Sequence, residues 1–326
     1  MTMRLILLTL FAVLLVAEPA SAKKNDRNPE GMVSQIQDDR IRESSGLAAS
    51  SRHSDLAYTV NDRGNDSALY AVQISTGQVV GVTNLSSLGF EDTESIAVDD
   101  EGTVWVGDLG DNDHQRDNIS IVSFPEPGPG NHELASAEQY RVKLPDGPFD
   151  VEGMLVHPRD GRVFLVSKNR EGLGKIYRLP ELAPGTTATA EDLDVAAPQM
   201  VTDATFTHDG RQALLRTEDD VWVYDTTSWQ PVTRVDTPKL QQGESITVEQ
   251  GDRTMLLGSE GKNSPLVRIP MPDREAGSGP IQLEGSSSPG PDTSLATIGL
   301  AVAGAMVLAG VGLQLRLRAG SGGRTA

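Results

Sequence analysis

The sequence predicts an all-β fold, a β-propeller of five four-stranded blades, from three observations. A short pattern recurs five times between residues 45 and 247. Each copy is followed at a similar offset by a turn containing Gly, Asp or Ser, residue types that tight hairpins favour. The apolar periodicity of helices is absent between residues 31 and 270, where Gly and Pro are frequent. Units of about 40–60 residues with four short strands are typical of propeller blades.

The recurring pattern is expected to form the first strand of each blade. It starts with a small or acidic residue, continues with Gly, Ser or Ala, and ends on two positions that tend to be apolar. The starting residues are Ser45, Glu94, Glu152, Asp203 and Glu244. Their spacings of 49, 58, 51 and 41 residues allow one blade per copy.

Three further runs in each unit predict the other strands. The second strands are expected at 56–60, 104–106, 163–166, 213–215 and 255–257. The third strands are expected after a polar loop, at 68–72, 119–124, 175–179, 221–224 and 265–269. A weaker fourth run is visible in only three units, at 79–82, 140–144 and 231–235.

The fifth unit lacks a fourth strand, and the start of the propeller can supply it. Residues 32–36 resemble residues 232–236, the run that precedes the fifth copy. An N-terminal strand in the last blade would close the ring and remove an open sheet edge. A sixth blade within the 58-residue interval or the linker stays open as an alternative, whereas a β-sandwich would not need five copies.

The two ends of the chain predict export and a single membrane anchor. Residues 1–22 combine a basic start, an apolar run and a small-x-small ending, as secretory signal peptides do. Residues 295–315 carry no charge, and a helix of that length spans about 30 Å of hydrocarbon. The three arginines in the tail 316–326 place it in the cytoplasm. The propeller at 23–270 would then be extracytoplasmic, joined to the cell membrane by a Gly/Ser/Pro-rich stalk at 271–294.

Composition excludes several classes of protein. The net charge of −18 argues against a nucleic-acid partner, because nucleic-acid binders usually show a basic face. The absence of cysteine excludes disulfides and thiolate metal sites. The sequence contains no Gly-x-Ser-x-Gly elbow, phosphate-binding glycine loop or dinucleotide fingerprint.

Blade geometry predicts where a site would lie. The first strand of a blade starts on the face where the second strand ends, so the repeating acids and the loops after the second strands gather at one mouth of the channel. Crowded carboxylates need a cation, basic partners, water or raised pKa values. The candidate metal ligands are Glu94, Glu152, Asp203, Glu244, Asp108 and Asp111.

Three interpretations of these acids are open. Structural carboxylates that accept backbone N–H bonds and connect neighbouring blades would also repeat once per blade. A bound divalent cation is the second interpretation, and oxygen ligands of this kind favour Ca²⁺ or Mg²⁺. Catalytic carboxylates are the third. The basic residues Lys168, Arg170 and Arg216 favour an anionic ligand at the mouth, although ion pairs with nearby acids explain them equally well.

Seven motifs, taken together, resemble those of a family of exported bacterial propeller proteins that are common in actinobacteria. They are Asn61-Asp-Arg-Gly, Glu91-Asp-Thr-Glu-Ser-Ile-Ala, Val106-Gly-Asp-Leu-Gly-Asp-Asn, Phe124-Pro-Glu-Pro, Val151-Glu-Gly-Met-Leu, Val201-Thr-Asp-Ala-Thr-Phe-Thr-His-Asp-Gly-Arg and Leu257-Gly-Ser-Glu-Gly-Lys-Asn-Ser-Pro. The resemblance covers about residues 40–270. It implies a secreted or membrane-tethered propeller, with a more distant similarity to phytase-like esterase propellers and WD-repeat-like propellers. The calcium and phosphate site of the phytase-like proteins has no residue-by-residue match here.

These observations leave three functions open. The first is a cell-surface module that binds an extracytoplasmic ligand or protein at the channel mouth, with Ca²⁺ as the cofactor. The second is a metal-dependent hydrolase of a phosphate ester, lactone or glycan, in which Glu94, Glu152 and Asp111 hold metal or act as acid and base. The third is a structural envelope protein.

Overall fold

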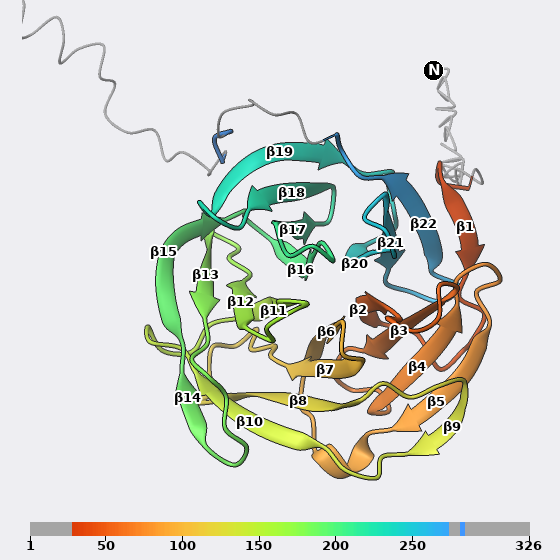
Figure 1. Cartoon of the computed structure of the whole chain (residues 1–326), viewed down its shortest axis with the longest axis horizontal. Helices are drawn as coiled ribbons and strands as arrows, with labels where there is room; N and C mark the ends of the chain where they lie inside the picture. The colour runs from red at the N-terminus through yellow and green to blue at the C-terminus, as the bar shows by residue number, and fades with distance from the viewer. Residues whose placement is uncertain (1–27, 274–280, 284–326) are drawn as a thin grey trace, which may run out of the picture.

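Five β-sheets surround a central channel in the computed structural model, which describes residues 28–273 and 281–283 (Figure 1). In each sheet four strands run outward from an innermost strand as antiparallel neighbours, so each sheet is one propeller blade. Within the described ranges the only helix is a short 3-10 turn, Ser86–Leu88. The all-β fold and the five blades predicted from the repeats are therefore confirmed.

The strands of each blade follow in order from the channel outward. Blade 1 contains β2 (Ser44–Ala49), β3 (Leu56–Asn61), β4 (Ala68–Gln73), β5 (Val79–Asn84) and β9 (Gly130–Glu133). Blade 2 contains β6 (Thr93–Val98), β7 (Thr103–Asp108), β8 (Ile119–Pro125), β10 (Glu138–Lys143) and β14 (Thr187–Thr189). Blade 3 contains β11 (Val151–Val156), β12 (Val163–Ser167), β13 (Gly174–Arg178) and β15 (Glu191–Ala197). Blade 4 contains β16 (Val201–Phe206), β17 (Gln212–Thr217), β18 (Asp220–Asp225) and β19 (Gln230–Asp236). Blade 5 contains β20 (Gly243–Val248), β21 (Thr254–Ser259), β22 (Pro265–Pro270) and β1 (Met32–Gln35).

The N-terminal strand closes the ring, as predicted. β1 pairs antiparallel with β22 and becomes the outer strand of blade 5. The backbone N–H of Ile36 extends this pairing by donating to the carbonyl of Ser264 at 2.9 Å. Gly77, in the turn after β4, packs against this strand so closely that a Cβ there would lie 1.7 Å from the carbonyl oxygen of Gln35. Blade 1 therefore holds the closing strand in place.

The long interval between the second and third repeats contains no sixth blade. Part of it forms β9, which pairs in parallel with β5 of blade 1. In the same way β14, which follows β13 in the chain, pairs in parallel with β10 of blade 2. Each of these two blades thus receives a fifth strand from the chain segment that follows it, which links neighbouring blades at their outer edges (Figure 1).

The apolar core lies between the blades. Five clusters of buried side chains each join residues of two neighbouring blades, such as Val106 with Leu69 and Leu165 with Leu109. Burial of this apolar surface favours the closed ring. The predicted signal peptide, most of the stalk, the predicted membrane helix and the basic tail lie outside the described residues. Within the described part of the chain, no helix is long and apolar enough to cross a membrane.

Two registers differ from the prediction. In blade 1 the bulge falls between Ser45 and Leu47, so Gly46 occupies the position predicted for Ser45. Every innermost strand has a bulge, and in blade 4 the bulge falls between Val201 and Asp203, so Thr202 occupies the position of Glu94 and Glu152. Asp203 instead pairs with Arg216, as Ser95 pairs with Gly107 in blade 2. The alignment of Asp203 with the other acids was therefore wrong by one residue, because sequence spacing does not reveal where a bulge inserts its extra residue.

Candidate functional site

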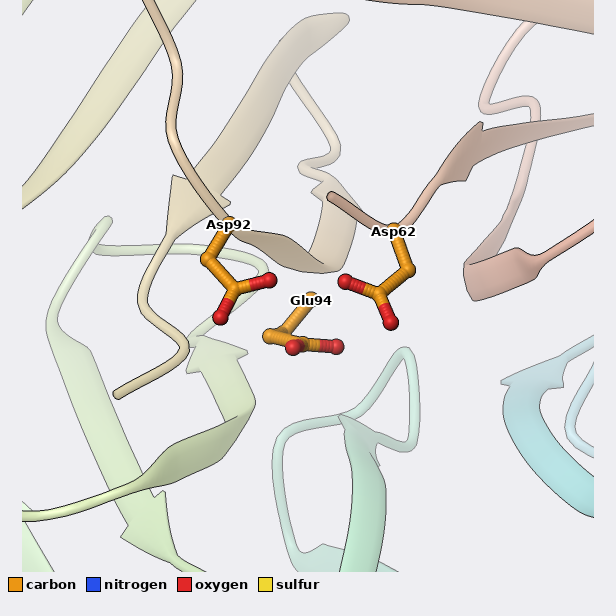
Figure 2. A group of neighbouring side chains, drawn as sticks. All are labelled: Asp62, Asp92 and Glu94. Carbon is orange, nitrogen blue, oxygen red and sulfur yellow. The ribbon is translucent and has the colours of Figure 1, made fainter. Parts of the chain in front are cut away.

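Three carboxylates from blades 1 and 2 meet at the channel mouth. Asp62 directly follows β3, whereas Asp92 and Glu94 lie at the start of β6. Figure 2 shows the three side chains turned toward one another. One oxygen from each lies within 4.8 Å of the others. We call Asp62, Asp92 and Glu94 the acid cluster.

The acid cluster is largely buried and incompletely satisfied. Asp92 and Glu94 are each 4% exposed. The Oδ1 atom of Asp92 is buried without a hydrogen-bond partner among the described residues. A buried carboxylate oxygen without a partner is costly, and it points to a group that would satisfy it.

Gly110 allows the carboxylates to come together. A Cβ at this position would lie 2.5 Å from Oδ2 of Asp92 and 2.6 Å from Oε1 of Glu94. Any larger residue would push these carboxylates apart. The glycine in the Asp108-Leu-Gly-Asp motif therefore contributes space to the site.

Burial and mutual repulsion both disfavour the ionised forms of the carboxylates in the acid cluster. Burial, followed by the neighbouring Asp62, raises the pKa of Asp92 to about 7. Burial and the charge of Glu152 raise the pKa of Glu94 well above its ordinary range, although Ser45 donates to its Oε2 at 3.0 Å. Three oxygen donors of this kind suit Ca²⁺, which binds six to eight oxygens and accepts water in the remaining positions.

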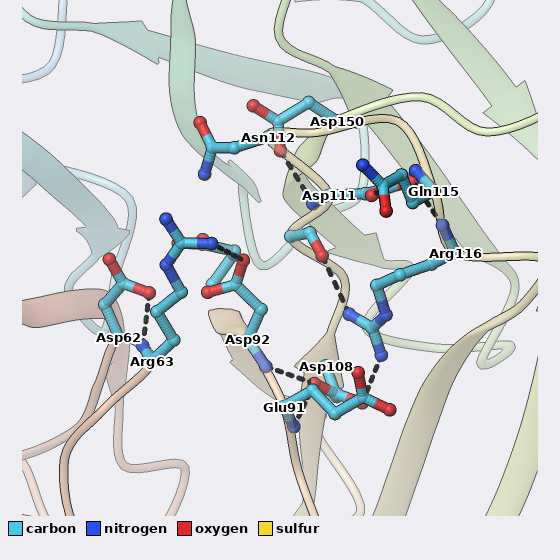
Figure 3. A network of polar contacts seen from close by, with 12 residues as sticks. Asp62, Arg63, Glu91, Asp92, Asp108, Asp111, Asn112, Gln115, Arg116 and Asp150 are labelled. Atoms are coloured by element: carbon cyan, nitrogen blue, oxygen red, sulfur yellow. Dashed lines mark hydrogen bonds and ion pairs between the residues drawn. The ribbon is translucent and has the colours of Figure 1, made fainter.

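Asp108, predicted as a metal ligand, instead supports the loop that carries Asp92. Its Oδ1 accepts the backbone N–H groups of Glu91 at 2.9 Å and Asp92 at 2.7 Å (Figure 3). Its Oδ2 forms an ion pair with Arg116 at 2.6 Å. Asp111 has a similar supporting role, since it accepts the backbone N–H groups of Gln115 and Arg116. Neither aspartate belongs to the acid cluster.

Glu152 and Glu244 lie in the mouth but outside the acid cluster. Lys168 donates to Oε1 of Glu152 at 2.8 Å, and both side chains are mostly buried. Burial nevertheless raises the pKa of Glu152 to about 8. Glu244 accepts a hydrogen bond from the amide of Gln242 at 2.8 Å, and burial raises its pKa. Lys168 is therefore a partner of these acids.

Asp203 is a structural acid that connects blades across the channel. It is fully buried, and its Oδ1 accepts the hydroxyl of Ser95 from blade 2 at 2.9 Å. Its Oδ2 accepts the backbone N–H of Ile246 from blade 5 at 2.9 Å. The Ser95 hydroxyl in turn accepts the backbone N–H of Met154 from blade 3 at 3.1 Å. One carboxylate thus organises contacts among four of the five blades.

Arg216 and Arg170, the other two basic residues predicted to bind an anionic ligand, lie in different surroundings. Arg216 is fully buried, and none of its side-chain nitrogens has a hydrogen-bond partner among the described residues. Arg170 is exposed and donates to Oδ1 of Asn112 at 2.7 Å. Lys168 and Arg216 thus both lie near the acid Glu244, whereas Arg170 contacts Asn112.

Of the six predicted metal ligands, Glu94 alone belongs to the acid cluster. The loops after the second strands were expected at the mouth, and Asp62 lies in one of them. Asp92 was missed, although a signal was available. It is an acid two residues before Glu94, in the segment that leads into the innermost strand, and that end of the strand is where the mouth was expected.

Comparisons with known proteins give distant structural similarities. No protein-family profile and no curated protein sequence matches the chain. The solved structure of a luciferin-regenerating enzyme is similar to this chain, with 10% sequence identity and a TM-score of 0.42. The match covers 69% of this chain and 76% of the enzyme chain. A chain of a nidogen–laminin complex is also similar, with 17% sequence identity and a TM-score of 0.39. This match covers 67% of this chain and 73% of the other chain. These distant likenesses assign no activity to the chain.

Proposed function

We propose that the protein is a ligand-binding β-propeller whose channel mouth binds a divalent cation at Asp62, Asp92 and Glu94. The observation that carries this proposal is the buried Oδ1 of Asp92, which has no hydrogen-bond partner in the described part of the chain and lies within a cluster of three carboxylates. Ca²⁺ is the cation of choice, because the donors are all oxygens. A bound cation with open coordination positions would then contribute to ligand binding at the mouth.

Calcium binding should be measurable in two ways, as a heat of binding and as an increase in the free energy of unfolding. Isothermal titration of the full-length protein with CaCl₂ should give one binding event. At a hundredfold excess over the dissociation constant, Ca²⁺ should raise the free energy of unfolding by about 2.7 kcal/mol. Asp92→Asn and Glu94→Gln should abolish both effects, because each removes a charged ligand.

Glu91→Gln is the matched control for these variants. Glu91 is an exposed carboxylate next to Asp92 and outside the acid cluster, so its replacement should leave calcium binding within twofold of wild type. Calcium binding that survives in both Asp92→Asn and Glu94→Gln would refute the site. So would a wild-type protein that shows no calcium-dependent heat or stabilisation.

A metal-dependent hydrolase is the second candidate, and Glu152 is the residue that favours it. A carboxyl group with a pKa of about 8 keeps its proton at neutral pH, as a general acid must. If the protein hydrolyses a phosphate ester, lactone or glycan, Glu152→Gln should lower kcat by about 10²-fold or more with calcium binding intact. The rate should fall as pH rises through about 8, where Glu152 loses its proton. Absence of turnover across a panel of these three substrate classes would count against the enzyme.

We further propose that residues 1–22 direct export and that residues 295–315 anchor the propeller in the cell membrane. In this topology the acid cluster faces an extracytoplasmic ligand or protein, and free calcium is more abundant outside cells than inside them. The full-length chain should fractionate with membranes after expression in an exporting host, and a chain ending at residue 294 should be released. Equal release of both chains would contradict the anchor. A structural envelope role gains no support from the buried acid cluster.

A further inference from the structure

Arg63 lies beside the acid cluster and is held only loosely. Its guanidinium Nη1 is 3.9 Å from Oδ2 of Asp92, which is beyond hydrogen-bond distance (Figure 3). The Arg63 side chain is 55% exposed, whereas that of Asp92 is 6% exposed. In the chain Arg63 lies between Asp62, a member of the cluster, and Gly64. The φ of Gly64 is +81°, and among the described residues no atom lies within 4 Å of a Cβ built on Gly64. The backbone next to Arg63 therefore lies in open space.

A neighbouring arginine, Arg116, is held more firmly than Arg63. Arg116 contacts Asp108 at 2.6 Å, its side chain is 15% exposed, and it also donates to the carbonyl of Gly110 at 2.8 Å. Arg63 has no comparable hydrogen bond to the cluster. It is nevertheless the one ion-pair partner that the described residues provide for Asp62, Asp92 or Glu94.

Arg63 does not satisfy the acid cluster completely. Arg63 lies nearest to Oδ2 of Asp92, while the Oδ1 atom of Asp92 has no hydrogen-bond partner among the described residues. A buried charge cluster is unstable without a counter-charge, because charges interact more strongly away from water. Arg63 supplies part of that counter-charge from 3.9 Å, too far for a hydrogen bond to Asp92.

We propose that Arg63 is the counter-ion of the cation-free cluster and that it makes the site selective for divalent over monovalent cations. This inference rests on the cation site proposed above. A monovalent ion that displaces Arg63 replaces one positive charge with another and brings no net electrostatic gain. A divalent ion brings one additional charge. Arg63 therefore excludes Na⁺ and K⁺ without being a metal ligand.

The test compares Na⁺ with choline, a monovalent cation too large to enter the cluster. Calcium affinity of the full-length protein is measured by isothermal titration at one ionic strength, in NaCl or in choline chloride. The wild-type protein should give the same affinity in both salts. In Arg63→Gln, calcium should bind about three- to fivefold more tightly than in wild type in choline, the range of a partly exposed ion pair. Na⁺ should then weaken calcium binding to Arg63→Gln by a similar factor, because it can enter the site.

Two further variants separate a local counter-ion from a general change in charge. Arg52→Gln is a matched control. The Arg52 side chain is also 55% exposed, and its Nε lies 3.9 Å from Oε2 of the buried Glu126. Arg52 lies in the turn between β2 and β3, at the opposite end of blade 1 from Arg63. Arg52→Gln should show no difference between the two salts. Arg63→Lys retains the charge and should behave like wild type.

The outcomes distinguish this inference from the cation site itself. If wild type binds calcium and Arg63→Gln shows neither tighter binding nor competition by Na⁺, the role of Arg63 is refuted while the cation site stands. If Arg63→Gln binds calcium more weakly than wild type in choline, Arg63 supports the bound state and the counter-ion role is again refuted. If wild type does not bind calcium at all, both proposals fail. Thermal unfolding in choline chloride checks that every variant is folded.

Discussion

Replacing Asp203 with asparagine is expected to lower the free energy of unfolding by about 3 kcal/mol, because a fully buried hydrogen-bond network is broken. Both carboxylate oxygens face donors, which are the Ser95 hydroxyl and the backbone N–H groups of Ala204 and Ile246. Burial raises the pKa of Asp203, while these donors and the charge of Arg216 favour its ionised form. Asparagine has nearly the same shape but turns an NH₂ group toward one of the donors. That donor then loses its acceptor in a fully buried position.

The measurement is urea denaturation of the full-length protein followed by tryptophan fluorescence. Asp236→Asn serves as the control, because the Asp236 side chain is 91% exposed on the outer strand of blade 4. It should change the free energy of unfolding by less than about 0.5 kcal/mol. A loss of under 1 kcal/mol in Asp203→Asn would mean that the contacts across the channel are not what holds the blades together.

The inner strands of the blades were predictable because they carry strong local signals. The second strand expected at 56–60, for example, corresponds to β3 at Leu56–Asn61, where apolar residues are bounded by turns. The outer strands β9 and β14 have no such signal. Both consist of mostly exposed residues, and both pair in parallel with a strand from the preceding blade. Their positions depend on a neighbouring blade and not on their own apolar pattern.

The acid cluster was only partly predictable, because the repeated acids have different roles in different blades. Glu94 lies in the cluster, Glu152 pairs with Lys168, and Asp203 connects the blades. A pattern of acids at equal spacing could place these side chains near one mouth. It could not distinguish them, since the difference depends on bulge position and on partners from other blades. The structural interpretation describes Asp203, and the cation interpretation is proposed for Glu94.

The buried charge of Arg216 is expected to have the second large effect on the stability of the propeller. It is fully buried, and burial lowers its pKa to about 10, while the charges of Glu244, Asp203 and Asp220 oppose this shift. Gly243 provides the space for its guanidinium, since a Cβ there would lie 2.5 Å from Nη2. The three acids surround the guanidinium without hydrogen-bonding to it. Arg216 thus acts on them through its charge.

Arg216→Met is therefore expected to lower the free energy of unfolding by about 2 kcal/mol, less than the full cost of breaking a hydrogen-bonded buried ion pair. Methionine fills much of the same volume, so the loss reports mainly the removed charge. If Arg216 compensates Glu244, the cost of Arg216→Met should fall by about 1 kcal/mol in a Glu244→Gln background, because neighbouring charges are coupled. Arg162→Met, which removes an arginine side chain that is 56% exposed, is the control and should be nearly neutral. An Arg216→Met protein as stable as wild type would show that the desolvation of the guanidinium outweighs its attraction to the three acids.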